Sequence, residues 1–179
     1  MRPLLREASV RGTAVVASLL VFLAGFAWSV FTKEEQLKNG AACIVRLAPR
    51  DPRAFLLGDH MVLNYAMNRE VDKALREREQ RALPADGVAV VRLDANGVAS
   101  FVRLDDGGPL EDDERRLHFR VRRGEASVAA RAFYFQEGTA KNFERAEYGE
   151  LRVDAQGRSL LAHLLDGNLD RIRPRKHAP

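Results

Sequence analysis

The sequence predicts a membrane anchor followed by one mainly antiparallel β domain with two short helices. Three observations predict this: a long uncharged run near the N-terminus, two similar strand-turn-strand patterns, and several segments in which polar and apolar residues alternate. A chain of 179 residues with 46% hydrophobic residues supplies one sizeable core beyond an anchor. We therefore expect a single domain of roughly seven or eight strands, and periodicity leaves open whether its sheet closes into a barrel.

Residues 12–32 form the uncharged run, and residues 1–11 before it carry Arg2, Arg6 and Arg11. About 20 apolar residues at about 1.5 Å per residue cross a hydrocarbon core of about 30 Å. Arginines before the span, with Glu34 and Glu35 after it, predict a cytoplasmic N-terminus and an extracytoplasmic body. A cleaved signal peptide is the alternative, because Gly25-Phe26-Ala27 offers small residues. The run is longer than a usual signal core, which favours an uncleaved anchor followed by a linker, residues 33–40.

Charge and cysteine content narrow the function classes. The chain has 29 basic and 25 acidic residues, a formal charge of +4 and a pI near 9.6, but the charges are interspersed and form no basic arm. We therefore expect no nucleic-acid partner. Cys43 is the only cysteine, so one chain can form neither a disulfide nor a thiolate cluster. Its small apolar neighbours predict a buried residue on the first strand.

The stretch from residue 49 to residue 65 combines a two-proline turn, a Gly58-Asp59 corner and a short strand. Pro52 fixes its own φ and forces Asp51 into the extended region, so the chain turns there. Asp59 can accept backbone N–H groups and hold the corner. The alternation after it predicts a strand with one apolar face made of Met61, Leu63 and Tyr65.

This stretch resembles the bacterial GDYXXLXY proteins, a family named for its motif. Gly58, Asp59, Leu63 and Tyr65 match the motif, whereas His60 stands where the family has its first tyrosine. A second block, residues 133–153, also resembles the family, so the likeness covers nearly all of the chain beyond the anchor. The resemblance implies no known activity. It implies a single-span protein, often encoded beside or fused to polytopic membrane proteins of unknown function. Together with the flanking charges, this gives the expectation of an inner-membrane protein with its domain in the periplasm.

The remaining elements follow from turn and periodicity signals. Residues 68–80 predict a polar helix, capped by Asn68, that buries Val71 and Leu75. Residues 91–98 and 151–158 predict two hairpins, with Gly97 and Gly157 in the left-handed position. We also expect a half-exposed strand at 115–123, a central strand at 126–135 and a short helix at 140–146 that is capped by Thr139. The β domain would thus cover residues 41–170, and the basic tail 171–179 would be disordered.

The sequence contains no P-loop, dinucleotide-binding glycine pattern, zinc-protease motif or nucleophile elbow. The acidic run 105–114 lacks the ligand order of a calcium-binding EF-hand, so it predicts a solvated loop. We expect no cofactor and no metal. The candidate site consists of the polar and motif residues of the two family-like blocks: Gly58, Asp59, His60, Leu63, Tyr65, Glu137, Glu144, Tyr148, Glu150 and Arg152.

Two interpretations of these residues remain. They can be ion pairs and hydroxyl bonds that hold the corners of a small β domain, or they can form a pocket for a small ligand or a hydrolase. The first interpretation predicts an interaction or assembly module that works with a polytopic membrane protein. The second places a general acid-base site among Asp59, Tyr65, Glu137, Glu144 and Tyr148. The absence of a nucleophile-base or metal motif favours the interaction module.

Overall fold

The computed structural model describes residues 3–48, 60–78, 84–136 and 139–173, with side chains from residue 15 onward. The chain divides into two compact units, Met1–Lys38 and Asn39–Pro179. The predicted arrangement of an N-terminal helix and a β-rich body is confirmed.

The first unit is helix α1, which spans Pro3–Asn39. Within it, Val15–Asn39 is long and apolar enough to cross a membrane. Apolar side chains such as Phe22 and Trp28 are exposed along the helix, as lipid-facing residues would be. Residues 33–39, expected as a linker, continue the helix.

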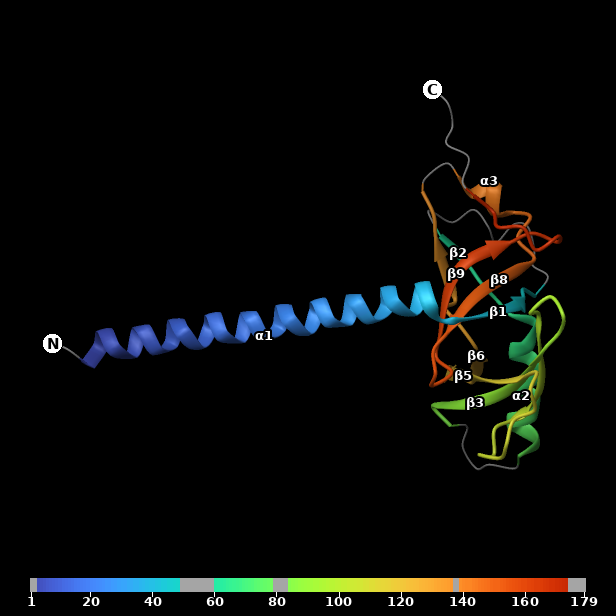
Figure 1. The fold of residues 1–179 in the computed structure, drawn as a ribbon, viewed down its shortest axis with the longest axis horizontal. Coiled ribbons are helices and arrows are strands. Elements are labelled where there is room, and N and C mark those ends of the chain that lie inside the picture. Colours follow the sequence, from blue (N-terminus) through green and yellow to red (C-terminus); the bar gives the residue numbers. More distant parts are fainter. Residues whose placement is uncertain (1–2, 49–59, 79–83, 137–138, 174–179) are drawn as a thin grey trace, which may run out of the picture. The chain divides into compact units, whose positions relative to one another are not determined.

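The second unit contains nine strands and two short helices within its described residues. Its strands are β1 (Ala41–Arg46), β2 (His60–Val62), β3 (Asp86–Leu93), β4 (Ala99–Leu104), β5 (Glu114–Arg122), β6 (Glu125–Ser127), β7 (Ala132–Tyr134), β8 (Tyr148–Val153) and β9 (Ser159–Leu165), and its helices are α2 (Ala66–Glu77) and α3 (Ala140–Phe143). The strands form three antiparallel sheets, in the orders β1-β8-β9, β2-β7 and β4-β3-β5-β6. Together the sheets curl into a half-barrel (Figure 1).

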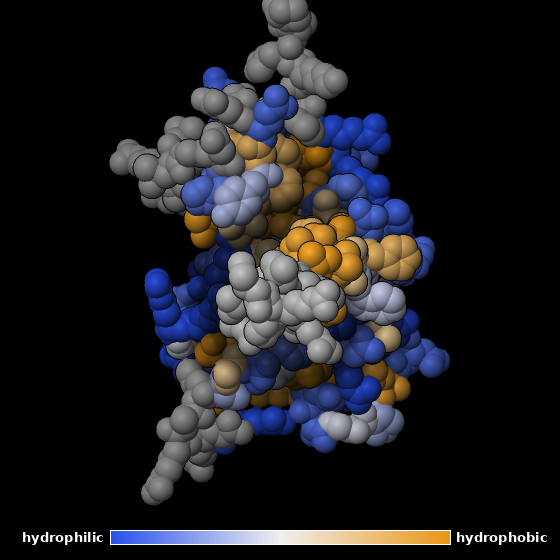
Figure 2. All heavy atoms as spheres, turned by 90° about the vertical axis from the view of Figure 1, so that its left-hand side faces the viewer, coloured by the Kyte–Doolittle hydropathy of each residue, from blue (hydrophilic) through white to orange (hydrophobic). Residues whose placement is uncertain are grey.

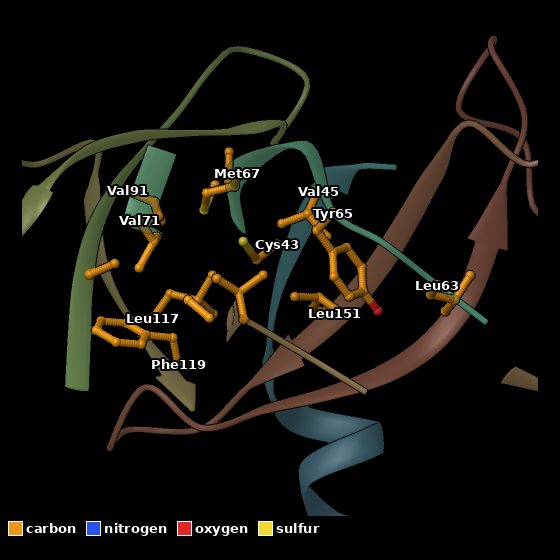
Figure 3. Close-up of a cluster of buried hydrophobic side chains, with 14 of the residues drawn as sticks. Cys43, Val45, Leu63, Tyr65, Met67, Val71, Val91, Leu117, Phe119 and Leu151 are labelled. Carbon is orange, nitrogen blue, oxygen red and sulfur yellow. The ribbon is translucent and has the colours of Figure 1, made fainter. Parts of the chain in front are cut away.

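One hydrophobic core lies between the sheets and α2. Cys43, Leu117 and Leu151 come from three different strands and point toward one another (Figure 3). Val71 and Leu75 of α2 are buried, as predicted, and so are Leu117 and Phe119 of β5. Figure 2 shows hydrophilic residues interspersed with hydrophobic ones on the face toward the viewer. The alternation of the sequence therefore identifies the buried faces correctly.

The two predicted hairpins, β3-β4 and β8-β9, join the larger sheets reciprocally. The turn of β3-β4 reaches β1 of the other sheet, where Ile44 donates its N–H to the carbonyl of Gly97 at 2.9 Å. The turn of β8-β9 reaches β5, where His118 donates its N–H to the carbonyl of Gly157 at 2.7 Å. Each hairpin thus satisfies a backbone donor in the sheet to which it does not belong.

The same side chain builds both hairpin turns. Asp94 accepts the N–H groups of Asn96 and Val98 through Oδ1, and Asp154 accepts those of Gln156 and Arg158 in the same way. Gly97 and Gly157 both have φ of +79°. This conformation suits glycine, since a Cβ atom crowds the backbone there.

A third aspartate turn follows β9. Asp166 accepts the N–H groups of Asn168 and Asp170, both at 3.1 Å. Leu169, with φ of +66°, occupies the left-handed position that glycine has in the two hairpins. Gly167, which follows Asp166 directly, occupies a different place in this turn.

Helix α2 begins earlier than predicted. Tyr65 is its N-cap residue, and no side chain caps the helix. Asn68 is buried inside the first turn, where its Oδ1 accepts the N–H of Val128 at 3.2 Å. The expectation that Asn68 caps the helix is wrong, because its side chain is used to hold a distant loop. Asp72 likewise accepts the N–H of Ala126 at 2.7 Å.

The predicted central strand at 126–135 is two short strands in different sheets, β6 and β7. Between them, the carbonyls of Val128 and Ala129 accept the hydroxyls of Ser159 and Ser127. These side-chain bonds take the place of a continuous ladder. The short helix α3 lacks the predicted cap from Thr139, whose hydroxyl donates to the carbonyl of Gln136 at 2.6 Å.

The described chain continues past the predicted end of the domain at residue 170. Arg171 forms an isolated bridge with Leu165, and Ile172 is buried and donates its N–H to Leu164 at 2.9 Å. Residues 171–172 therefore belong to the fold, because Ile172 adds apolar surface to the core. Residues 174–179 of the predicted tail lie outside the described residues.

Comparing alanine substitutions at the two turn glycines tests the reciprocal docking. At Gly97 a Cβ would meet nothing within 4 Å, so Gly97→Ala loses only the conformational preference, about 1 kcal/mol. At Gly157 a Cβ would lie 2.9 Å from the carbonyl oxygen of Arg116, a backbone atom of β5. Gly157→Ala is expected to lower the free energy of unfolding distinctly more in denaturant titrations of the detergent-solubilised chain. Equal losses would show that this turn does not depend on β5.

Candidate functional site

The candidate residues from the sequence separate into several places. Leu63 and Tyr65 are buried in the core, and His60 lies at the start of β2. Tyr148, Glu150 and Arg152 share one face of β8, whereas Glu144 is exposed at the end of α3. Gly58, Asp59 and Glu137 lie outside the described residues.

Tyr65, the last motif residue, joins the two family-like blocks inside the core. Its side chain is 1% exposed, and its hydroxyl donates to the carbonyl of Ala130 at 2.9 Å. The ring lies against Gly149 of β8, where a Cβ would come within 3.5 Å of Tyr65 Cε1. Burial raises the pKa of the Tyr65 phenol above its ordinary value, so the hydroxyl stays protonated and donates its hydrogen bond. Tyr65 is therefore a structural residue.

His60 has different surroundings from the other motif residues. It pairs with Tyr134 across the β2-β7 ribbon, and the two rings are 5.5 Å apart and tilted by 34°. Tyr134 is 75% exposed, and Val62 on the same face is also exposed. The opposite face of the ribbon packs inward, with Phe133 and Phe135 against Phe143 of α3. His60 therefore belongs to the outer face of the ribbon.

Glu150 is the centre of a polar cluster on the outer face of β8. Only 6% of the residue is exposed, and both oxygens of its carboxylate accept hydrogen bonds from an arginine. Arg171 donates from Nε to Oε2 at 2.9 Å and from Nη2 to Oε1 at 3.0 Å, in a two-bond arrangement. Arg152 approaches Oε1 with Nη2 at 3.0 Å and donates from Nη1 to the carbonyl of Gly40 at 3.2 Å. Such pairs fix both side chains.

Two further basic residues and His163 surround this cluster. His163 stands directly opposite Glu150 in the register of β9. Burial lowers the pKa of His163 below its ordinary value, and nearby Arg171, Arg152 and Arg173 lower it further, whereas Glu150 opposes them. Arg46 of β1 pairs with Tyr148, two positions from Glu150, and so points to the same face. Arg46 and Arg173 are both exposed.

The family-like blocks indicate Tyr148, Glu150 and Arg152, whereas the basic residues near them lie outside those blocks and were not predicted. Arg171 and Arg173 were assigned to a disordered tail, although the polar-apolar-polar order of Arg171, Ile172 and Arg173 is a short strand-like signal. His163 was missed because β9 carries a register irregularity opposite Glu150 and Leu151, which shifts its alternation.

A second buried carboxylate, Glu114, lies in the other large sheet. Its side chain is 2% exposed and lies 3.0 Å from Nη1 of Arg103 and 3.2 Å from Nη2 of Arg92. Burial raises its pKa, but the hydrogen bond from Arg103 and the N–H of Glu111 lower it, and the pKa lies below the ordinary value. The predicted solvated loop 105–114 thus ends in a buried ion pair. Glu114 is the first residue of β5, so these ion pairs hold the start of that strand.

The arrangement suits recognition better than proton transfer. Glu150 lies between two guanidinium groups that engage its carboxylate oxygens, and the Tyr65 hydroxyl is enclosed in the core. Among the described residues, no group of three His, Cys, Asp or Glu side chains could hold a metal ion. Cys43 is buried, and burial raises its pKa to about 12, so the thiolate is not formed near neutral pH.

Removing one hydroxyl tests the role of Tyr65. Tyr65→Phe removes the hydrogen bond that the enclosed hydroxyl donates to the carbonyl of Ala130, which costs about 1 kcal/mol in the free energy of unfolding. Tyr134→Phe makes the same chemical change on an exposed ring and should stay within about 0.5 kcal/mol of the parent. Urea titrations of both variants measure the difference. A stable Tyr65→Phe chain that had lost its function would place the phenol in a site.

Neutralising one carboxylate tests the polar cluster. Glu150→Gln leaves Arg152 and Arg171 without their counter-charge, and breaking a fully buried pair costs about 3 to 5 kcal/mol. Because Arg171 is 46% exposed, we expect a smaller loss of about 1 to 3 kcal/mol. Glu144→Gln changes an exposed carboxylate and serves as the control. Equal unfolding free energies for the two variants would contradict a structural role for Glu150.

The comparisons with known proteins agree with the motif. No curated protein and no solved structure matches the chain. The family described as GDYXXLXY protein matches residues 22–164, which include β1 to β8, almost all of β9 and the second half of α1. Arg171 and Arg173 lie beyond the matched range. Since the match covers most of the sequence, the chain belongs to the GDYXXLXY protein family.

Proposed function

We propose that the chain is a single-pass inner-membrane protein whose β domain lies in the periplasm and serves as an interaction or assembly module for a polytopic membrane protein. The observation that carries this proposal is the continuity of the chain. A helix able to cross a membrane ends at Asn39, and strand β1 of the domain begins at Ala41. A module tethered so closely needs only a modest interface, because confinement to the bilayer raises its effective concentration.

The orientation rests on charge. Arg2, Arg6 and Arg11 precede the apolar run, whereas Lys33 is followed at once by Glu34 and Glu35. Basic residues flanking a span remain on the cytoplasmic side, which places the N-terminus inside and the domain outside.

The solvent face of α2 is the surface that we assign to the partner. Its inner face is buried through Met67, Val71 and Leu75, so the helix is held rigidly. Its outer face presents both charge signs around a shallow open hollow lined by Arg69, Asp72, Lys73, Arg76 and Glu77. The pair Lys73–Glu77 is largely exposed, with a separation of 3.8 Å, and contributes little to stability. Such charges select a partner by complementarity.

The alternative of a ligand pocket or hydrolase receives less support. It requires Tyr65, Glu144 and Tyr148 to converge with Asp59 and Glu137, and the last two lie outside the described residues. Of the others, Tyr65 is enclosed in the core and Glu144 is exposed beyond α3. A buried phenol bonded to a backbone carbonyl is poorly placed for acid-base chemistry on a ligand.

Site-specific crosslinking tests the proposal. A photoreactive side chain at Glu77 of α2 is expected to trap one membrane protein in intact cells, because this exposed position borders the charged hollow. Arg120, exposed on the outward basic face of β5, is the second test position. The same side chain at Asn168, in the turn after β9, is the matched control and should trap no protein. Adducts are identified by mass spectrometry.

Two outcomes would contradict the proposal. Equal yields of protein adduct at all three positions would indicate random collision. The absence of an adduct at both Glu77 and Arg120 would show that neither surface binds a partner. A C-terminal reporter that fluoresces only in the cytoplasm tests the orientation independently. Bright fluorescence from an intact chain would show that the domain lies in the cytoplasm.

A further inference from the structure

We propose that the outer face of the β1-β8-β9 sheet binds the phosphate headgroups of anionic phospholipids. This face is formed by Ile44 and Arg46 of β1, Tyr148, Glu150 and Arg152 of β8, His163 of β9, and Arg171 and Arg173 after it. It is distinct from the α2 surface assigned to a protein partner.

This face is basic. Arg152 and Arg171 contact the carboxylate of Glu150, Arg46 shares the face through its pairing with Tyr148, and Arg173 lies close enough to His163 to lower its pKa. Glu150 is the one acid among the face residues named above. One carboxylate balances one guanidinium, so the four positive charges and one negative charge leave a formal excess of three. Arg46 and Arg173 are exposed, so this excess faces outward.

The geometry of the guanidinium groups also suits phosphate. Glu150 engages Nε and Nη2 of Arg171, and within the part of the chain that the structure describes the Nη1 edge of that planar group remains for another acceptor. A buried carboxylate thereby holds Arg171 in place before any ligand binds, and less side-chain entropy is lost on binding. Guanidinium groups bind phosphate oxygens through paired hydrogen bonds, which makes arginine well suited to phosphate. Near neutral pH, His163 adds a neutral ring N–H, since burial and the arginines lower its pKa.

The position of β1 in the chain indicates the source of the phosphate. β1 follows directly after α1, and it supplies Arg46 to the basic face. The helical residues between the uncharged run and β1 span only about 10 Å at about 1.5 Å per residue. A short tether holds the domain close to the headgroups, so they are present at a far higher local concentration than a soluble phosphate. The anchor and the basic face together therefore favour lipid.

The test uses the full chain in nanodiscs whose lipids carry a nitroxide quencher on the headgroup. A fluorescent maleimide is placed at Asn168→Cys, in the exposed turn next to Arg171, and in a second preparation at Lys73→Cys on α2. Cys43 does not compete for the dye, because it is buried and its pKa is about 12. Quenching is compared between phosphatidylcholine discs and discs that also contain phosphatidylglycerol.

We expect phosphatidylglycerol to increase quenching at position 168 but not at position 73, and salt to reverse the increase. The double variant Arg46→Gln with Arg173→Gln should lower the ratio of docked to free domain about 30-fold, because each arginine near an anionic surface is worth about a fivefold factor. The matched control, Arg120→Gln with Arg122→Gln, removes the same charge from β5 and should leave the quenching unchanged. Thermal melts of both variants check that the fold is kept.

Quenching that is the same in both kinds of disc would overturn the proposal. So would an equal loss in the two double variants, which would indicate attraction by net charge without a specific face. An increase at position 73 that matched the one at position 168 would likewise show that the domain approaches the bilayer without this orientation.

Discussion

The fold depends on the two carbonyl groups that the hairpin turns offer to the opposite sheets. Gly97 accepts the N–H of Ile44, and Gly157 accepts the N–H of His118, so neither sheet is complete without the turn of the other. The two larger sheets are separate in strand order. These two bonds still make each sheet depend on the other for the acceptor of one backbone N–H. Because a buried backbone N–H without a partner is costly, the bonds also fix the distance across which the core must pack.

The positions of the motif residues relative to these sheets explain their roles. Tyr65 spans from β8, where its ring covers Gly149, to the carbonyl of Ala130 in the segment between β6 and β7. It therefore links the β1-β8-β9 sheet to the segment that connects the other two sheets. Its neighbours Met61 and Leu63 are also buried, whereas His60 faces outward against Tyr134. The burial of Met61, Leu63 and Tyr65 explains why the motif alternates. A different side chain at position 60 would leave the core undisturbed, because His60 faces outward.

The sequence predicts what local periodicity and turn chemistry determine, namely the long apolar N-terminal helix, both hairpins and the buried side of β5. It does not predict features decided by distant parts of the chain. Asn68 looked like a cap because its bond to Val128, 60 residues away, has no local signal. Arg171 looked like part of a tail because its partner Glu150 lies two elements earlier. For the same reason, the face of β8 that bears Glu150 was identified, but not the arginines that make it basic.

We propose a recognition domain held at a bilayer, because the chain combines a β-rich domain, an adjoining helix long and apolar enough to cross a membrane, and charged outer faces. Affinity purification of the full chain from membranes in a mild detergent tests this proposal most directly. We expect that a polytopic membrane protein is recovered in a fixed ratio, that charge reversal at Lys73 and Arg76 of α2 removes it, and that Tyr148→Phe on β8 does not. Recovery that is unaffected by the α2 charges but lost on changing Tyr148, Glu144 or Glu137 would contradict it.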